Sequence, residues 1–346
     1  MTVGPGLQGL WYGPAWRTVL LWPPALLFGV AVAARRTLYA AGVLRRSRVD
    51  VPVVVVGNLT VGGTGKTPVA AWLARQLTLR GHRVGVVLRG YGGRDSRRVR
   101  VVEPGDSPRD VGDEALLHAA GGPHVVVIGA DRVAAARMAA DRGAAIVVCD
   151  DGLQHLRLAR DYEIAVVDAD RGFGNGWMLP AGPLREPTGR LESVDAVVRT
   201  WRSEGSDTPV HPRRPFVLDA RLSIGAAVNL ASGERCDLGR FRGGRVHAVA
   251  GIGNPQAFFA ALVAAGLDVE GHALPDHAAI IPTQIGLAAG ATVLMTAKDA
   301  VKCRECAEPG WWYVELDVRV ERDAAGELLA MILDRAGLTG AGVQIG

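Results

Sequence analysis

The chain has 346 residues, with 39 lysines and arginines against 35 aspartates and glutamates and a formal charge of +4. Apolar residues make up 49% and charged residues 21%, which excludes an intrinsically disordered protein; the length fits about two domains. Four cysteines in a chain this long exclude a disulfide scaffold and suit a reducing compartment.

The basic residues are unevenly placed. Six arginines and a single acidic residue, Asp50, lie within residues 1–50, so the net positive charge belongs to this segment and no nucleic-acid partner is expected. Only three of the basic residues are lysines: Lys66, Lys298 and Lys302. Where arginine is used so widely, a remaining lysine indicates a position that needs a compact ammonium group.

The amino-terminal segment contains an uncharged apolar run, residues 18–34. As a helix it would be about 26 Å long, marginal for a bilayer core of about 30 Å, and Pro23 and Pro24 are expected to break a single helix. Aromatic residues at its start and arginines after it favour a helix lying in the membrane surface. A spanning helix, and a helix packed on the protein or on a second copy, remain alternatives.

From residue 51 the pattern alternates between strands and helices. Strands are predicted at 51–57, 83–88, 125–128, 145–149, 164–167 and 196–199, with helices at 66–80, 113–120 and 131–142. After a polar, proline-containing stretch at 203–215, further strands are predicted at 216–222, 226–230, 245–250, 269–274, 292–296 and 312–318, with helices at 255–265 and 322–336. This order predicts a doubly wound α/β fold.

The strongest motif is GNLTVGGTGKT at residues 57–67, between a buried strand and a helix. Its backbone N–H groups could surround phosphate oxygens, while Lys66 would contact the β- and γ-phosphates and Thr67 would hold Mg²⁺. Thr60 stands where the common form of this P-loop has glycine. The predicted nucleotide-binding residues are Thr60, Val61, Gly62, Gly63, Thr64, Gly65, Lys66 and Thr67.

Carboxylates follow two other elements of this first half. Asp150 and Asp151 end a buried strand, where a carboxylate would bind Mg²⁺ or its waters, and His155 follows shortly after. Asp113 begins a predicted helix, and from its position alone it is better explained as an amino-terminal cap. An apolar, turn-rich segment from Asn175 to Pro187 encloses a single charged pair and suggests a shaped binding loop.

Taken together, the motifs and their order resemble the tetraacyldisaccharide 4′-kinase family, the lipid A 4′-kinases. The resemblance covers nearly the whole chain. It rests on GNLTVGGTGKTP (57–68), RGYGG (89–93), VGDE (111–114), DDGLQH (150–155), LPAGPLREP (179–187), GIGNPQAFF (251–259), PDH (275–277) and TAKDAVK (296–302).

The resemblance implies a P-loop NTPase-like kinase that phosphorylates the 4′-hydroxyl of a tetraacylated glucosamine disaccharide 1-phosphate with ATP and Mg²⁺, at the cytoplasmic face of the bacterial inner membrane. Its domains would be a membrane-associated segment (1–48), a kinase domain (49–212), a β linker (213–232) and a smaller α/β domain (233–346). By motif position Asp113 would be the catalytic base and His277 its partner. The remaining implied roles are Mg²⁺-associated acids at Asp150, Asp151 and Glu186, and substrate contacts at Arg185, His155 and Asn175.

Two other functions are weighed against this one. A soluble P-loop ATPase of the metal-insertion or partitioning type usually has lysine where this chain has Val61, and it needs no apolar leader. A membrane-bound scaffold with a purely structural nucleotide site would show no lipid-dependent ATP turnover.

Overall fold

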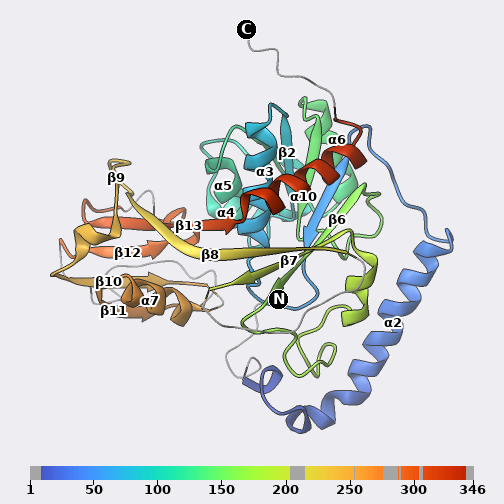
Figure 1. The fold of residues 1–346 in the computed structure, drawn as a ribbon, viewed down its shortest axis with the longest axis horizontal. Coiled ribbons are helices and arrows are strands. Elements are labelled where there is room, and N and C mark those ends of the chain that lie inside the picture. The colour runs from blue at the N-terminus through green and yellow to red at the C-terminus, as the bar shows by residue number, and fades with distance from the viewer. Residues whose placement is uncertain are drawn as a thin grey trace.

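A computed structural model describes residues 9–202, 215–252, 254–275, 287, 290–303 and 307–339. Its centre is a mixed sheet of 13 strands that runs through both halves of the chain (Figure 1). The first half contributes β1 (Val53–Gly57), β2 (Val84–Leu88), β3 (Arg100–Val101), β4 (Val125–Ile128), β5 (Ile146–Asp150), β6 (Tyr162–Asp168) and β7 (Ala196–Trp201). The second half contributes β8 (Phe216–Asn229), β9 (Arg235–Cys236), β10 (Arg245–Ala250), β11 (Asp268–Ala273), β12 (Val293–Thr296) and β13 (Trp311–Val320).

Helices cover both faces of this sheet. The helices of the described residues are α2 (Trp22–Ala40), α3 (Lys66–Leu79), α4 (Pro108–Val111), α5 (Asp113–Ala120), α6 (Arg132–Asp141), α7 (Pro255–Ala264), α9 (Ala297–Ala300) and α10 (Arg322–Arg335), and all but α2 pack in or beside the layers around the sheet. Short 3-10 helices are η1 (Ala15–Leu21), η2 (Arg94–Arg97), η3 (Thr188–Ser193) and η4 (Leu238–Phe241). The predicted doubly wound α/β fold is therefore confirmed.

The strand order is β11-β10-β12-β13-β8-β7-β6-β1-β5-β2-β4-β3, with β9 paired to β8. β1 lies between β5 and β6, parallel to both, and all five of its residues are buried. Side chains on a strand alternate between faces, so Val54 and Val56 pack with α3 on one face while Val53 and Val55 pack with α6 on the other. This two-sided burial explains the unbroken valine run in the sequence.

One strand replaces the two predicted at 216–222 and 226–230. β8 continues from Phe216 to Asn229, pairing parallel with β7 and antiparallel with β13. Gly225 lies inside this continuous strand and accommodates a close neighbour: a Cβ there would lie 3.0 Å from an Asp317 carboxylate oxygen. The pairing register also shifts between Val314 and Leu316, so the irregularity is absorbed within the strand pair.

The last helix joins the two halves of the chain. α10 follows β13, and its buried residues Leu328, Leu329 and Ile332 belong to the same core as β1 and α3 (Figure 1). β10, β12 and β13 form a second parallel group covered on one face by α7. The division into separate domains stays a prediction.

The amino-terminal helix α2 extends along the side of the molecule (Figure 1). Pro23 and Pro24 stand in its first turn, where a missing N–H costs nothing, so the expected break does not occur and the helix runs to Ala40. The helical segment Ala15–Ala40 is long and apolar enough to cross a membrane, and only 11% of its most apolar window is buried.

Candidate active site

The sheet brings the P-loop and the acidic pair together. β1 and β5 are parallel neighbours, and Val56 lies opposite Asp150. The glycine-rich loop that follows β1 and the carboxylates that end β5 therefore lie together at the carboxyl ends of these parallel strands. This is the location at which open α/β sheets bind their ligands.

The P-loop leads directly into α3. Gly65 precedes the helix with φ +83°, a left-handed conformation that glycine adopts without strain, and a Cβ there would lie 2.7 Å from Leu222. Lys66 and Thr67 begin the helix, at its positive end. Burial lowers the pKa of Lys66, but Asp151, Glu114 and Asp150 outweigh this effect and raise it above its ordinary value. Lys66 is therefore a cation held among three carboxylates.

The turn-rich loop predicted at 175–187 holds the first part of the P-loop. Thr60 and Leu184 form an antiparallel bridge. The Val61 amide donates to the Pro183 carbonyl at 2.8 Å, and the Arg185 amide donates to the Leu59 carbonyl at 2.6 Å. Because these contacts hold Thr60 in an extended, strand-like conformation, this position does not require glycine.

Asp151 is paired with Arg185. The guanidinium donates to both carboxylate oxygens, at 3.0 Å and 3.4 Å, and also donates to the side chain of the fully buried Asn58. Burial would raise the pKa of Asp151, but Lys66 and Arg185 together bring it well below its ordinary value. Asp151 is thus an anion whose two oxygens already have a partner.

Asp150 is arranged differently. Its Oδ2 lies 3.0 Å from His118 Nε2, and both side chains are only 1% exposed. Its Oδ1 is buried without a hydrogen-bond partner among the described residues. A buried carboxylate oxygen left in this way suits a hard cation or one of its water ligands, so this donor set fits Mg²⁺.

Glu186 is buried within a polar network beneath the P-loop. Gln154 Nε2 donates to Glu186 Oε1 at 2.9 Å and to the Asn58 carbonyl at 3.1 Å. Glu186 Oε2 lies 3.4 Å from Arg190 Nε and 3.8 Å from an Arg36 nitrogen on α2. Glu186 therefore connects the P-loop to the amino-terminal helix.

Asp113 contacts the other half of the chain. The N-cap of α5 is Gly112 and Asp113 is the first residue of the helix itself, so the capping interpretation of Asp113 was wrong. Lys302 Nζ lies 3.5 Å from Asp113 Oδ2 and 2.9 Å from Asp299 Oδ1. Asp299 is fully buried, and its other oxygen accepts hydrogen bonds from the Gly251 amide and the Thr296 hydroxyl.

Comparison with known proteins identifies the arrangement. The family model described as tetraacyldisaccharide-1-P 4′-kinase matches residues 17–334. The chain belongs to this family. It is 45% identical to a tetraacyldisaccharide 4′-kinase of Azoarcus sp. (strain BH72), over 94% of this chain and 95% of the relative. It is 46% identical to the protein of that name from Pseudomonas paraeruginosa (strain DSM 24068 / PA7), over 92% and 94%.

A solved structure agrees with the fold. The crystal structure of LpxK from Aquifex aeolicus in complex with ATP matches with a TM-score of 0.78 and 28% identity, covering 92% of this chain and 99% of that one. The chain is thus a kinase of the tetraacyldisaccharide 4′-kinase family, and the resemblance seen in the motifs is confirmed. ATP and Mg²⁺ are its expected nucleotide and metal.

Two of the predicted substrate contacts, His155 and Asn175, have neighbours within the chain itself. His155 lines a pocket of about 340 Å³ with Asp131 and Arg132, and burial with Arg132 lowers its pKa to about 4. The Asn175 amide donates to the Ala181 carbonyl at 2.8 Å and its oxygen accepts from the Trp177 amide, so both groups brace the loop. His277 lies outside the described residues.

Sequence reasoning missed several residues of the kinase site. Asn58 Nδ2 donates to Thr64 Oγ1 at 2.9 Å and thereby closes the P-loop on itself. His118 and Gln154 orient Asp150 and Glu186, although neither stands out in the sequence. Lys302 did carry a signal, since it is one of three lysines, but only the fold reveals its contact with Asp113.

Proposed function

We propose that this kinase transfers the γ-phosphoryl group of ATP to the 4′-hydroxyl of a tetraacylated glucosamine disaccharide 1-phosphate, giving lipid IVA in lipid A biosynthesis. The transfer takes place at the cytoplasmic surface of the inner membrane. The observation that carries the proposal is the position of Asp113: Gly112, not Asp113, is the N-cap of α5, and Lys302 holds the Asp113 carboxylate between the two halves of the chain.

Asp113 is assigned as the general base. Its carboxylate accepts the proton of the sugar hydroxyl while that oxygen forms a bond to the γ-phosphorus, and the bond to the bridging oxygen of ADP breaks. A base placed in this way accelerates such a step about 10²–10⁴-fold. Lys66 remains protonated and contacts the phosphates, whose negative charge it offsets.

Residues that would hold Mg²⁺ are Thr67, at the start of α3, and Asp150, through its unpartnered Oδ1. When bound, the metal neutralises charge on the phosphates. Both oxygens of Asp151 already accept hydrogen bonds from Arg185. Asp151 is therefore assigned to orienting Arg185 and to stabilising the positive charge of Lys66. Glu186 would support the metal-binding residues indirectly, because Gln154 donates both to Glu186 and to the Asn58 carbonyl at the P-loop.

A lipid substrate is supported by the surroundings of α2. A pocket of about 390 Å³ lies between this helix and the loop at 176–178. Its lining is mostly apolar: Ala25, Leu26, Gly29, Val30, Ala33, Gly176, Trp177 and Met178. The Trp22 and Trp177 rings stack with centroids 4.5 Å apart, and Arg36 links the same helix to Glu186. An acyl chain in this pocket would lie beside the phosphate-transfer site.

The decisive experiment measures ATP turnover of the full chain in mixed micelles, with and without the tetraacyldisaccharide 1-phosphate. We expect turnover to require the lipid and its product to carry a new phosphate at the 4′ position. Lys66→Ala should abolish most of this activity and keep the circular dichroism spectrum. Equal turnover without lipid would instead indicate a soluble-type ATPase, and no turnover in either case would indicate a scaffold.

A further inference from the structure

A second cluster of metal-binding side chains lies at the far edge of the sheet. β11 is the edge strand, β10 is its parallel neighbour, and five strands separate β10 from β1. Val246, Ala248 and Ala250 of β10 pack with α7, so the alternation of side chains places His247 on the opposite face. His247 lies opposite Glu270 in the register, and His272 follows two residues later on the same face.

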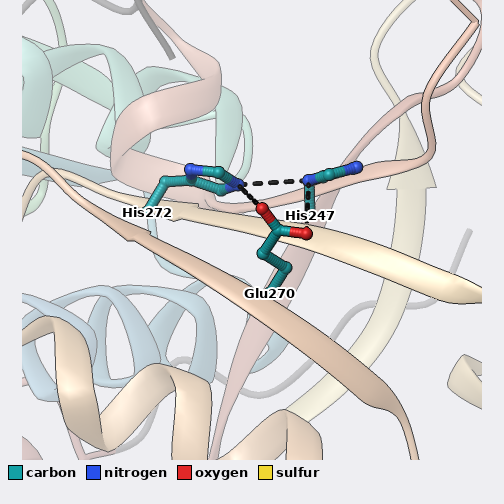
Figure 2. Close-up of side chains that lie close together, drawn as sticks. All are labelled: His247, Glu270 and His272. Carbon is teal, nitrogen blue, oxygen red and sulfur yellow. Dashed lines mark hydrogen bonds and ion pairs between the residues drawn. The ribbon is translucent and has the colours of Figure 1, made fainter. Parts of the chain in front are cut away.

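These three side chains converge on one point (Figure 2). His247 Nδ1 and His272 Nε2 face each other at 3.1 Å. The two Glu270 oxygens lie 3.8 Å from these nitrogens, one opposite each ring. The imidazoles are about one-fifth exposed, whereas Glu270 is 47% exposed and free to move on its long side chain.

This geometry is close to that of a metal-binding site. Two ligand atoms at about 2.1 Å from a tetrahedral Zn²⁺ are about 3.4 Å apart, so the two nitrogens need move only by a few tenths of an ångström. The carboxylate must approach slightly, which an exposed glutamate can do. A single shared proton can join only two of these three groups, the two imidazole nitrogens and the carboxylate. One divalent cation can bind all three.

We propose that His247, Glu270 and His272 bind one divalent transition-metal ion of the Zn²⁺ type, at a site separate from the phosphate-transfer site. Two imidazoles and one carboxylate favour such ions over Mg²⁺, which prefers oxygen ligands. Three protein ligands leave the remaining coordination to water. The bound ion joins the edge strand to β10 and so stabilises this end of the sheet.

One neighbouring cation opposes binding. Arg245 lies 3.9 Å from the Glu270 oxygen that faces His247, and it also lies 3.5 Å from Asp268. Its side chain is 64% exposed and has this second carboxylate available, so it can leave Glu270 to the metal. Removing Arg245 is therefore expected to strengthen metal binding.

The test is a Zn²⁺ titration of the full chain in detergent, by competition with a zinc-chelating dye in excess Mg²⁺. We expect one equivalent bound at about 10 µM or tighter. His247→Ala, His272→Ala and Glu270→Gln should each weaken binding at least about tenfold and remove the rise in melting temperature that Zn²⁺ causes. His82→Ala and Cys236→Ser are the matched controls, and they should bind as the parent chain does.

The proposal would be overturned by no binding of the full chain at about 100 µM Zn²⁺, or by unchanged binding in all three ligand variants. Loss of binding in Cys236→Ser would assign the ion to a thiol and overturn it as well. Glu270→Gln alters an exposed side chain and should not affect folding, so it remains informative if a histidine variant does not fold. Co²⁺ gives a second readout, since nitrogen and oxygen ligands give visible bands without thiolate absorption.

Discussion

Lys302 Nζ lies 3.5 Å from Asp113 Oδ2 and 2.9 Å from Asp299 Oδ1, so one ammonium group joins carboxylates from the two halves of the chain. The Lys302 and Asp113 side chains are each only 8% exposed. Burial lowers the pKa of Lys302, but Asp299 and Asp113 raise it above its ordinary value, so the group stays charged at neutral pH. Lys302 is therefore a positioning residue for the proposed base.

The first prediction concerns Lys302→Met, which keeps the length of the side chain and removes its charge. We expect kcat to fall at least about tenfold. General-base catalysis accelerates such a step about 10²–10⁴-fold, and a mispositioned base loses much of this rate acceleration. The KM for ATP should change little. Lys302→Arg should recover part of kcat, since a cation is restored. Steady-state kinetics with saturating lipid measure both parameters.

Arg235→Met is the matched control for this variant. Arg235 forms an exposed ion pair with Glu315 at 2.6 Å, away from the P-loop and Asp113, and such pairs contribute little to stability. It should leave kcat unchanged. Equal losses of kcat in Lys302→Met and Arg235→Met would reject the positioning role.

The second prediction concerns membrane binding by α2. Leu27 and Val30 are 72% and 67% exposed, and replacing both by glutamate should move the kinase from vesicles to the soluble fraction. Leu79→Glu is a matched control, because Leu79 is 70% exposed at the end of α3 and should not affect sedimentation with vesicles.

Salt separates two modes of membrane association for the parent chain. A helix lying in the interface, flanked by arginines, should be released as ionic strength rises, because anionic-lipid contacts are screened. Extraction by detergent alone, with no effect of salt, would show instead that the helix spans the bilayer.

The third prediction is a pH dependence of stability caused by His155. Its pKa is about 4 in the folded chain against the ordinary 6.5, so between these values the unfolded chain binds a proton that the folded chain does not. Stability should therefore fall as the pH falls through this window, by at most about 3 kcal/mol. Thermal melting between pH 4 and 7 measures the slope.

His155→Gln should flatten that slope. Burial also lowers the pKa of His124 and His272. The variants His124→Gln and His272→Gln therefore show how much one histidine contributes to the pH dependence of stability. An unchanged slope in His155→Gln would mean that the histidine is protonated as easily in the folded chain as in the unfolded one.

Much of the fold could be predicted because hydrophobic periodicity and burial agree along this chain. The strands at 125–128 and 245–250 have the predicted bounds, since most of the residues of each are apolar and buried. The two strands predicted at 216–222 and 226–230 are one strand, because β8 pairs with β7 over its first part and with β13 over the rest, and Gly225 accommodates Asp317 across the strand pair. Pairing between distant strands leaves no mark in local sequence.

The site was predictable only in part, for a related reason. The P-loop and the acids after β5 are local motifs whose chemistry dictates their residues, and β1 and β5 are neighbours. Asp113 looked like a cap because position in a helix is also local information. Its contact with Lys302 joins residues 189 positions apart, which no periodicity or spacing could indicate.

The last prediction treats Asp113 and His277 as a coupled pair, with His277 assigned by its motif. Asp113→Asn keeps the shape of the side chain and a hydrogen-bonding oxygen for Lys302 but accepts no proton, so kcat should fall about 10²–10⁴-fold with little change in ATP affinity. His277→Ala should lower kcat similarly. Because residues that act as a unit are not additive, the double variant should be scarcely worse than the worse single one. The rate of phosphoryl transfer in a single turnover is measured for each variant. Fully additive losses of this rate would reject the pair, and an active Asp113→Asn enzyme would reject Asp113 as the base.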